Sequence, residues 1–348
     1  MPAEWERHDA TWIAWPHHEP DWPGKLDAVR WTYAEIVRVL ADHERVQILC
    51  QSDAVRDSAM GALRAHDAAM DRVNLLVVPT DRVWLRDSGP SFVWNAEGTV
   101  EIMAWDFDAW SKYDNYSRDR KVPDTVQRET GLVMTPATRP DDRSRRLVLE
   151  GGGIDVNGGG RIMVTEEWLL SDVQVRNPGL TREGYERAFA EYLGCDDTIW
   201  LGNGAVGDDT HGHVDDIARF VNASTAVLAY EPDSSDANHA SSVDNLQRLR
   251  NAALRQPLEV VLLPYPRAVM MDGQRLPASY ANFYIANEVV IVPTFNDPND
   301  RVALGIIADL FPGRQVVGIH SVDLVWGLGT LHCLTQQQPA IGLKSSGV

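Results

Sequence analysis

The chain has 348 residues, 44% of them apolar and 24% charged, which is enough to bury a sizeable core in one large domain or two smaller ones. Fifty acidic and 32 basic side chains give a formal net charge of −18, which disfavours nucleic acid or an anionic membrane as a partner. The sequence contains no run of about 18 apolar residues and does not begin with a secretory signal pattern. We therefore expect a globular cytoplasmic protein.

The cysteines and tryptophans limit the possible chemistry further. Cys50, Cys195 and Cys333 are too few for a disulfide framework, and none belongs to a CxxC pair that would indicate structural zinc. Any cysteine chemistry would therefore depend on a single thiol. Some of the 12 tryptophans could line an aromatic pocket for a cation, although an acidic surface is explained equally well by solubility alone.

Apolar runs and amphipathic stretches alternate along the chain. Apolar residues that recur every three or four positions predict helices, and short apolar runs bounded by turn residues predict strands. In chain order these are helix Leu26–Ala41 with strand "VQILC", hairpins "SFVWNAEGTVEIMAW" from Ser91 and "IDVNGGGRIMVT" from Ile154, helix "LTREGYERAFAEYLG" with strand "TIWLG", hairpin "IARFVNASTAVLAY" from Ile217, helix Ser242–Arg255 with strand "LEVVLLP", hairpin "FYIANEVVIVP" from Phe283, and helix Asp300–Phe311 with strand "QVVGI".

The four hairpins repeat at a nearly constant interval. Counted from Phe92, Ile154, Ile217 and Phe283, the steps are 62, 63 and 66 residues. Joining the C-terminal "TLHCLTQQ" to the N-terminal "ATWIAWP" would supply a fifth hairpin and close a ring, which removes exposed sheet edges. We therefore predict an α/β fold, a five-bladed pseudo-symmetric propeller of ββαβ repeats forming one domain over residues 1–348. A two-domain doubly wound sheet is the alternative, but the hairpins favour antiparallel pairs.

Polar motifs stand just ahead of the hairpins. "WLRDSGP" contains Asp87, "LEGGGID" contains Glu150 and "HGHVDDI" contains His213 and Asp215, while Cys333 falls in the last hairpin. Equivalent points of a ring converge near its axis, so these five side chains are expected to share one pocket. Each also has a simpler interpretation, because "RDSGP" is a turn sequence, "EGGG" provides permissive backbone and a lone cysteine is usually a small buried apolar residue.

The stretch "DDTHGHVDDIARF" allows three interpretations. His211, His213, Asp215 and Asp216 could bind a metal, because His-x-His in a strand places both imidazoles on one face, but no other cluster supplies clear remaining ligands. A solvated charge cluster would not normally adjoin the apolar run "IARFV". The third interpretation makes His213 a general acid/base and Asp215, on the same strand face, a carboxylate for a cationic substrate.

Long ordered motifs carry a family resemblance. The chain resembles the agmatine deiminases of the guanidine-modifying superfamily in "MPAEWERHDATWIAWP", "WLRDSGPSF", "LVLEGGGIDVNGGGRIMVTEEWLL", "RNPGLT", "GDDTHGHVDDIARF", "LPASYANFYIANEVVIVPTFNDP" and "GTLHCLTQQQP". The resemblance implies a pentein-type five-bladed α/β propeller, the substrate agmatine, the products N-carbamoylputrescine and ammonia, and neither metal nor organic cofactor. A homodimer is a family-level expectation only.

The resemblance also implies a role for each site residue: catalysis by Cys333 as nucleophile, His213 as general acid/base and Glu150 beside it, and binding of the guanidinium by Asp87, Asp215 and Trp84. We expect binding of the cationic substrate to promote formation of the thiolate, since the surrounding acids oppose it in the empty protein. Three other functions stay open, namely a deiminase of free or peptidyl arginine, a metal-dependent hydrolase and an inactive polyamine-binding protein. Position 211, often Asp or Asn in the family, is a histidine here.

Overall fold

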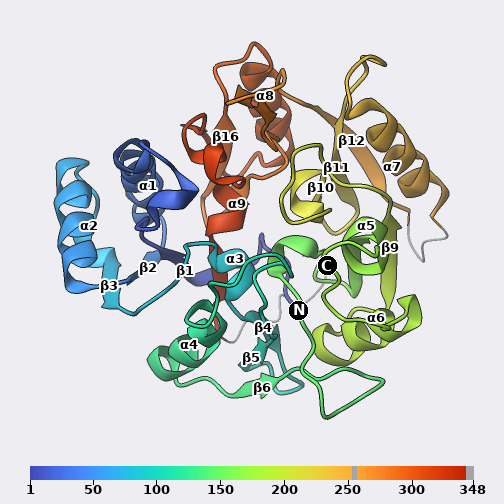
Figure 1. Cartoon of the computed structure of the whole chain (residues 1–348), viewed down its shortest axis with the longest axis horizontal. Coiled ribbons are helices and arrows are strands. Elements are labelled where there is room, and N and C mark those ends of the chain that lie inside the picture. Colours follow the sequence, from blue (N-terminus) through green and yellow to red (C-terminus); the bar gives the residue numbers. More distant parts are fainter. Residues whose placement is uncertain (253–256, 342–348) are drawn as a thin grey trace.

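The computed structural model describes residues 1–252 and 257–341, and over these the chain is an α/β protein with five mixed sheets and one small separate hairpin (Figure 1). Each mixed sheet begins with an antiparallel pair and continues with a parallel strand. In Figure 1 the five sheets follow one another in chain order around the middle of the molecule. The fold class predicted from the sequence is therefore confirmed at the level of an α/β protein built from strand–strand–helix–strand units.

The strands have the following bounds. The first sheet, with order β18-β1-β2-β3, contains β1 (His8–Ala14), β2 (Arg45–Cys50), β3 (Val73–Val77) and β18 (Gln336–Pro339). Each of the other four mixed sheets has three strands. They are, sheet by sheet, β4 (Ser91–Trp94), β5 (Val100–Ala104) and β6 (Met134–Pro136); β7 (Asp155–Val156), β8 (Arg161–Thr165) and β9 (Asp197–Leu201); β10 (Ala218–Asn222), β11 (Thr225–Tyr230) and β12 (Glu259–Pro264); and β15 (Tyr284–Ile285), β16 (Val289–Thr294) and β17 (Gln315–His320). The small hairpin consists of β13 (Met270–Met271) and β14 (Gln274–Arg275).

A helix connects the second strand of each unit to the parallel strand that follows. The longer helices are α1 (Leu26–Ala41), α2 (Asp53–Ala65), α4 (Val122–Thr130), α6 (Arg182–Ala188), α7 (His239–Asn251) and α8 (Asn299–Leu310), and the short ones are α3 (Leu85–Ser88), α5 (Glu166–Leu170) and α9 (Leu331–Leu334). Of the helices in the described residues, none is long and apolar enough to cross a membrane.

Local sequence explains these elements. In α1 the buried side chains Val29, Tyr33, Val37 and Leu40 recur every three or four residues and form one apolar face. In β16 the residues Val289–Pro293 are all buried, because this strand lies between β15 and β17 and is covered on both faces. The helical periodicity and the continuous apolar runs thus place the helices outside and the central strands inside.

Most of the predicted elements are confirmed, with shifted ends. Helix Leu26–Ala41 has the predicted bounds, Thr181 caps α6 by accepting a hydrogen bond from the Gly184 amide, and Gly194 is left-handed with φ of 67°. The predicted helix Ser242–Arg255 corresponds to α7, and its residues 253–255 lie outside the described part of the chain. The segment α2–β3, which adds a fourth strand to the first sheet, had not been predicted.

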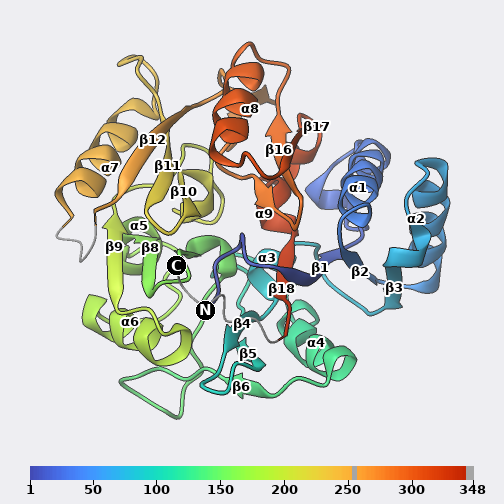
Figure 2. The same cartoon turned by 180° about the vertical axis from the view of Figure 1, so that it is seen from behind.

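The predicted pairing of the two ends of the chain is confirmed, but one detail is wrong. Strand β18 pairs antiparallel with β1, and the two strands meet near the middle of the molecule when it is seen from behind (Figure 2). Cys333, however, lies on the short helix α9 and not in the hairpin. The segment turns because the Leu334 amide donates to the Thr330 carbonyl and the Thr335 hydroxyl donates to the Leu331 carbonyl, so only Gln336 onward is extended.

Candidate active site

Residues that stand ahead of four different sheets meet near the middle of the molecule. Asp87 lies on α3 ahead of β4, Glu150 precedes the 3-10 turn Gly151–Gly153 ahead of β7, His213 precedes the 3-10 turn Val214–Asp216 ahead of β10, and Cys333 lies on α9 ahead of β18. The first strands of the units thus deliver these side chains to one place, as the repeat predicts.

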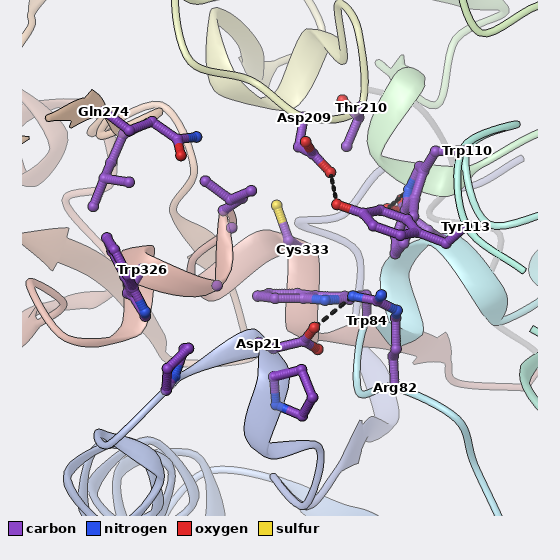
Figure 3. Close-up of a pocket in the computed structure, with 17 residues that line it drawn as sticks. Asp21, Arg82, Trp84, Trp110, Tyr113, Asp209, Thr210, Gln274, Trp326 and Cys333 are labelled. Carbon is purple, nitrogen blue, oxygen red and sulfur yellow. Dashed lines mark hydrogen bonds and ion pairs between the residues drawn. The ribbon is translucent and has the colours of Figure 1, made fainter. Parts of the chain in front are cut away.

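A cavity of about 290 Å³ opens onto the thiol. The Cys333 sulfur points into this space in Figure 3. Aromatic and polar side chains wall the cavity, among them Trp84, Asp87, Trp110, Tyr113, Asp21, Arg82, Asp209 and Gln274. Trp84, the predicted wall residue, packs next to Gly329 on one side, and Cys333 packs next to it on the other. A Cβ at Gly329 would come within 2.8 Å of the Trp84 ring and 3.1 Å of the Cys333 Cβ, so this position needs a residue without a side chain.

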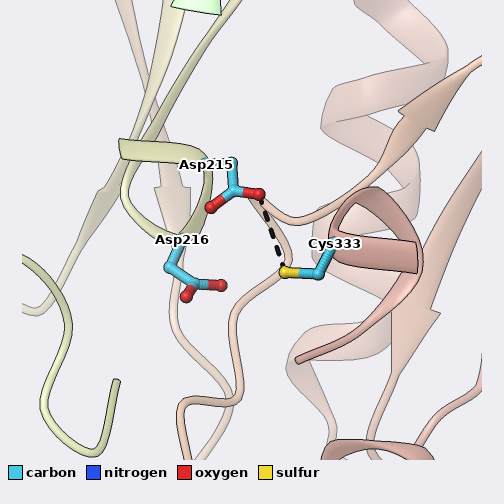
Figure 4. Close-up of side chains that lie close together, drawn as sticks. All are labelled: Asp215, Asp216 and Cys333. Carbon is cyan, nitrogen blue, oxygen red and sulfur yellow. Dashed lines mark hydrogen bonds between the residues drawn. The ribbon is translucent and has the colours of Figure 1, made fainter. Parts of the chain in front are cut away.

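The environment of the thiol is acidic and buried. The Cys333 thiol donates to Asp215 Oδ2 at 3.6 Å, and the Asn282 amide donates to the sulfur at 3.1 Å. Asp216 lies beside them, and Figure 4 shows both carboxylates facing the sulfur. Burial, followed by the charges of Asp215, Asp216 and Asp87, raises the pKa of Cys333 well above its ordinary value. These surroundings therefore favour the neutral thiol.

His213 lies between two carboxylates without a close hydrogen bond to either. Its Nδ1 is 3.7 Å from Asp87 Oδ1 and its Nε2 is 3.5 Å from Glu150 Oε2. Within the described residues neither ring nitrogen has a hydrogen-bond partner, although the side chain is 1% exposed. Burial lowers the pKa of His213, but the charges of Asp87 and Glu150 outweigh it and raise the pKa to about 9. The surrounding charges thus favour the imidazolium, whose two N–H groups have no acceptor within hydrogen-bond distance among the described residues.

Glu150 is held in its ionised form. Its Oε1 accepts from Arg176 Nε at 3.0 Å and its Oε2 accepts from Trp168 Nε1 at 2.7 Å. Burial alone would raise the pKa of this carboxyl, but the charge of Arg176 and the proximity of His213 lower it to about 2. A permanent negative charge therefore stands beside the His213 imidazole.

Asp87 is fixed by neighbours and points to the same place. Its Oδ1 accepts from the Gly152 amide at 3.0 Å and its Oδ2 accepts from Trp110 Nε1 at 2.8 Å. Burial raises the pKa of Asp87 to about 6, His213 opposes the shift, and Asp215 adds to it. A Cβ at Gly152 would lie 2.6 Å from His213 Nδ1, 2.9 Å from Asp87 Oδ1 and 3.1 Å from Asp215 Oδ2. The three side chains therefore converge on this glycine.

Asp215 is anchored from behind by a buried chain of charged groups. Its Oδ2 is 2.7 Å from His332 Nδ1, and His332 Nε2 is 2.9 Å from Glu4 Oε2. Glu4 in turn pairs with Arg219 at 2.9 Å and with Arg86 at 3.2 Å. Burial would raise the pKa of Asp215, but the hydrogen bond and charge of His332 lower it. The other oxygen, Oδ1, is buried and has no hydrogen-bond partner in the described residues, so it can accept from a bound cation.

The expectation that His213 and Asp215 share a strand face is wrong. Both precede β10, which begins at Ala218, and they are separated by a 3-10 turn. His211 turns away, with φ of 63° and Nε2 on the Ser171 hydroxyl at 2.9 Å. The side chains in the described residues that could hold a metal together are Asp215, Asp216 and Cys333, without either histidine. The geometry thus gives no support to the metal site built from His211 and His213.

Several site residues had not been singled out from the sequence. Arg82 lines the cavity, whereas Arg86 bonds to Gln337 and Glu4 and does not line it. Arg176 and Trp168 lie within the quoted motifs "RNPGLT" and "VTEEWLL", and His332 adjoins the cysteine in "LHC". A buried arginine or tryptophan in a motif is ambiguous in sequence, since it also serves packing.

Cys333 and Asp87 line the cavity, and the His213 imidazolium and the Asp215 carboxylate are buried directly beside them. Together these groups define a site suited to a flat cation attacked by sulfur. The chain belongs to the Porphyromonas-type peptidyl-arginine deiminase family, whose sequence profile matches residues 1–339. It is 33% identical to the agmatine deiminase of Ectopseudomonas mendocina over 366 residues, which covers 98% of this chain and 95% of the relative. The family predicted from the sequence is thereby confirmed.

Solved structures have the same fold over nearly the whole chain. The agmatine deiminase of Enterococcus faecalis superimposes with a TM-score of 0.87 at 29% identity, covering 97% of this chain and 95% of that one. A C. jejuni agmatine deiminase with a cysteine-to-serine substitution and substrate bound has a TM-score of 0.86, covering 98% and 96%. The latter is 24% identical and supports the fold alone.

Proposed function

We propose that this protein hydrolyses agmatine to N-carbamoylputrescine and ammonia through a covalent intermediate on Cys333. The observation that carries the proposal is the convergence of the thiol, the His213 imidazolium and the carboxylates of Asp87 and Asp215 beside one cavity. Its relatives named agmatine deiminases support the substrate.

The first half of the reaction transfers the amidine carbon to sulfur. Asp87 and Asp215 hold the N–H groups of the guanidinium and fix its carbon in front of Cys333. The bound cation offsets the acidic charges that oppose the thiolate, so substrate binding promotes ionisation of the thiol, whose proton passes to solution. The thiolate attacks the carbon to form a C–S bond, and His213 protonates one amino group, which leaves as ammonia.

The second half returns the thiol. The cationic thiouronium stays on Cys333, and His213, now neutral, takes a proton from water while the oxygen attacks the same carbon. Collapse of the tetrahedral adduct breaks the C–S bond, expels the thiolate and leaves the ureido product. The remaining hydroxyl proton passes to the thiolate and restores the thiol, while ammonia takes up a proton from solution, which balances the one that the thiol released. Glu150 keeps His213 oriented and charged at the start of each cycle.

Two carboxylates elsewhere on the cavity wall suit the distal ammonium of agmatine. Asp21 and Asp209 both line the cavity, and Asp209 lies near enough that its charge, after burial, contributes to raising the pKa of Asp21 to about 6. Tyr113 links them, because its hydroxyl donates to Asp209 at 2.7 Å and the Arg82 guanidinium that pairs with Asp21 stacks on its ring at 4.1 Å. A cation placed between the two carboxylates would reduce their repulsion.

The same wall argues against free arginine. Arg82 is the cation that a substrate carboxylate would need, but its guanidinium is already engaged by Asp21 and by Asn115 Oδ1 at 3.3 Å. Lys112, the other cation beside this wall, is likewise paired with Asp209. Among the described residues, the α-carboxylate of arginine would therefore face two acidic side chains without a free counter-charge.

Ammonia release from agmatine, arginine and a blocked arginine peptide tests the substrate. We expect agmatine to have the highest kcat/KM. Asp21→Asn and Asp209→Asn should each lower kcat/KM for agmatine about 10- to 100-fold, the value of a hydrogen bond to a charged group, but leave it unchanged for butylguanidine, which lacks the ammonium. Equal losses on both substrates would contradict the assignment of these carboxylates to the ammonium.

We also propose that the five units form a five-bladed pseudo-symmetric propeller and that residues 1–348 are one catalytic domain. The cyclic order of the sheets in Figure 1 and the pairing of β18 with β1 support this architecture. A cytoplasmic location, a homodimer and the lack of a nucleic-acid partner stay predictions from the sequence.

A further inference from the structure

Four of the five units place a site residue ahead of their first strand. Asp87, Glu150, His213 and Cys333 stand ahead of β4, β7, β10 and β18. The corresponding place ahead of β15 (Tyr284–Ile285) is occupied by Asn282, whose side chain is 0% exposed. The fifth unit therefore also presents a polar side chain to the centre.

The hydrogen bonds of Asn282 determine how its amide is oriented. The Oδ1 atom accepts from the His332 amide at 3.0 Å and from the Thr330 hydroxyl at 2.8 Å. Because a backbone N–H only donates, the atom that faces His332 must be the oxygen. The other end of the amide is therefore NH2, and it faces the thiol.

The two amide protons have separate acceptors. Nδ2 donates to the Cys333 sulfur at 3.1 Å and to Asp216 Oδ1 at 3.0 Å. The other side chain bonded to the sulfur is Asp215, which accepts a proton from the thiol but repels a thiolate. When the thiol ionises, the contact with Asp215 thus becomes unfavourable and the contact with Asn282 becomes stronger.

We propose that Asn282 is a further catalytic residue, which stabilises the Cys333 thiolate through its Nδ2–H and fixes the Thr330–Cys333 turn through its Oδ1. The proposal rests on the proposed function only in that Cys333 is the nucleophile there. Asn282 acts on the sulfur itself, whereas Asp87 and Asp215 act on the substrate.

The test measures the rate of Cys333 alkylation by iodoacetamide against pH in the full-length protein without substrate. Asn282→Ala should move the midpoint of the profile about one to two pH units higher, the usual effect of losing a hydrogen bond to a charged group. Asn282→Asp keeps acceptors for His332 and Thr330 but replaces the donor with a carboxyl, so it should move the midpoint at least as far. With agmatine, both variants should lower kcat about 10- to 100-fold and change KM little.

Asn245→Asp is the matched control. Asn245 is 1% exposed and holds the backbone of Gly202 and Asn203 through both ends of its amide, on an element that does not contribute to the cavity. This variant should lose stability as any buried asparagine variant would, but should keep the wild-type alkylation midpoint. A shift in the control equal to that in the Asn282 variants would overturn the proposal.

Three further outcomes are decisive. Folded Asn282 variants with the wild-type midpoint and kcat would refute the role of Asn282. If both variants fail to fold, the NMR signal of the Asn282 side-chain amide in the wild-type protein carries the test, since it should shift as Cys333 ionises and stay constant in Cys333→Ser. If wild-type protein releases no ammonia from agmatine while the alkylation midpoint still depends on Asn282, the proposed function fails and this inference stands.

Discussion

Substitution of Gly152 by alanine adds one methyl group at the point where three site residues converge. The new Cβ would lie 2.6 Å from His213 Nδ1 and 2.9 Å from Asp87 Oδ1, whereas ordinary contact begins at 3.4 Å. The imidazole must therefore retreat by roughly 0.8 Å, and because a misplacement of about 1 Å costs on the order of 100-fold in rate, we expect kcat to fall roughly 100-fold. The overall fold should survive, since overpacking costs about 1–3 kcal/mol.

The assay is ammonia release from agmatine, with urea unfolding to confirm that the variant is folded. Gly159→Ala is the matched control, because Gly159 lies in the turn between β7 and β8, has no left-handed φ, and its Cβ would be 3.4 Å from the nearest atom. We expect the control to keep wild-type kcat. If folded Gly152→Ala turns over at the wild-type rate, His213 and Asp87 do not need their observed positions and the proposed mechanism is wrong.

Three more predictions concern the charged groups of the site and the dependence of the reaction on a thiol and not on a metal. Activity requires the Asp87 carboxylate, with a pKa of about 6, and the His213 imidazolium, with a pKa of about 9. We therefore expect kcat/KM to rise as the pH passes about 6 and to fall as it passes about 9. A pH profile without either limb would contradict these roles. Arg176→Met leaves Glu150 buried without its cation, so we expect it to lower the free energy of unfolding, measured with urea, by about 3–5 kcal/mol. Arg128→Met, which removes a surface ion pair, should change the same quantity by under about 1 kcal/mol. A chelator should leave turnover unchanged and iodoacetamide should abolish it; loss of activity with the chelator alone would favour a metal-dependent reaction.

The repeat explains how much of the site could be predicted from the sequence. Asp87, Glu150 and His213 each carry a titratable group at the same place before a hairpin, so the spacing of about 62–66 residues was enough to expect them in one pocket. Asn282 occupies the corresponding place in "YANFY", but an amide without charge gives no comparable signal among buried tyrosines and phenylalanine. Its importance follows only from the distances to Cys333 and Asp216.

Other features depended on contacts between segments far apart in the chain. Arg82 and Arg86 are four residues apart, and nothing local shows that the first lines the cavity while the second pairs with Glu4, 82 residues away. The strand assignment of Cys333 failed for a related reason. "TLHCLTQQ" has the composition of a strand, but the bonds of Thr330 and His332 to Asn282 hold its first half in a turn.

The central claim is that Cys333 carries the amidine carbon during turnover. Mass spectrometry of the acid-quenched reaction with agmatine tests it most directly. We expect the peptide containing Cys333 to gain the mass of agmatine less ammonia, the adduct to disappear as N-carbamoylputrescine forms, and Cys333→Ser to release no ammonia. Ammonia release without an adduct on that peptide, or turnover by Cys333→Ser at the wild-type rate, would contradict it.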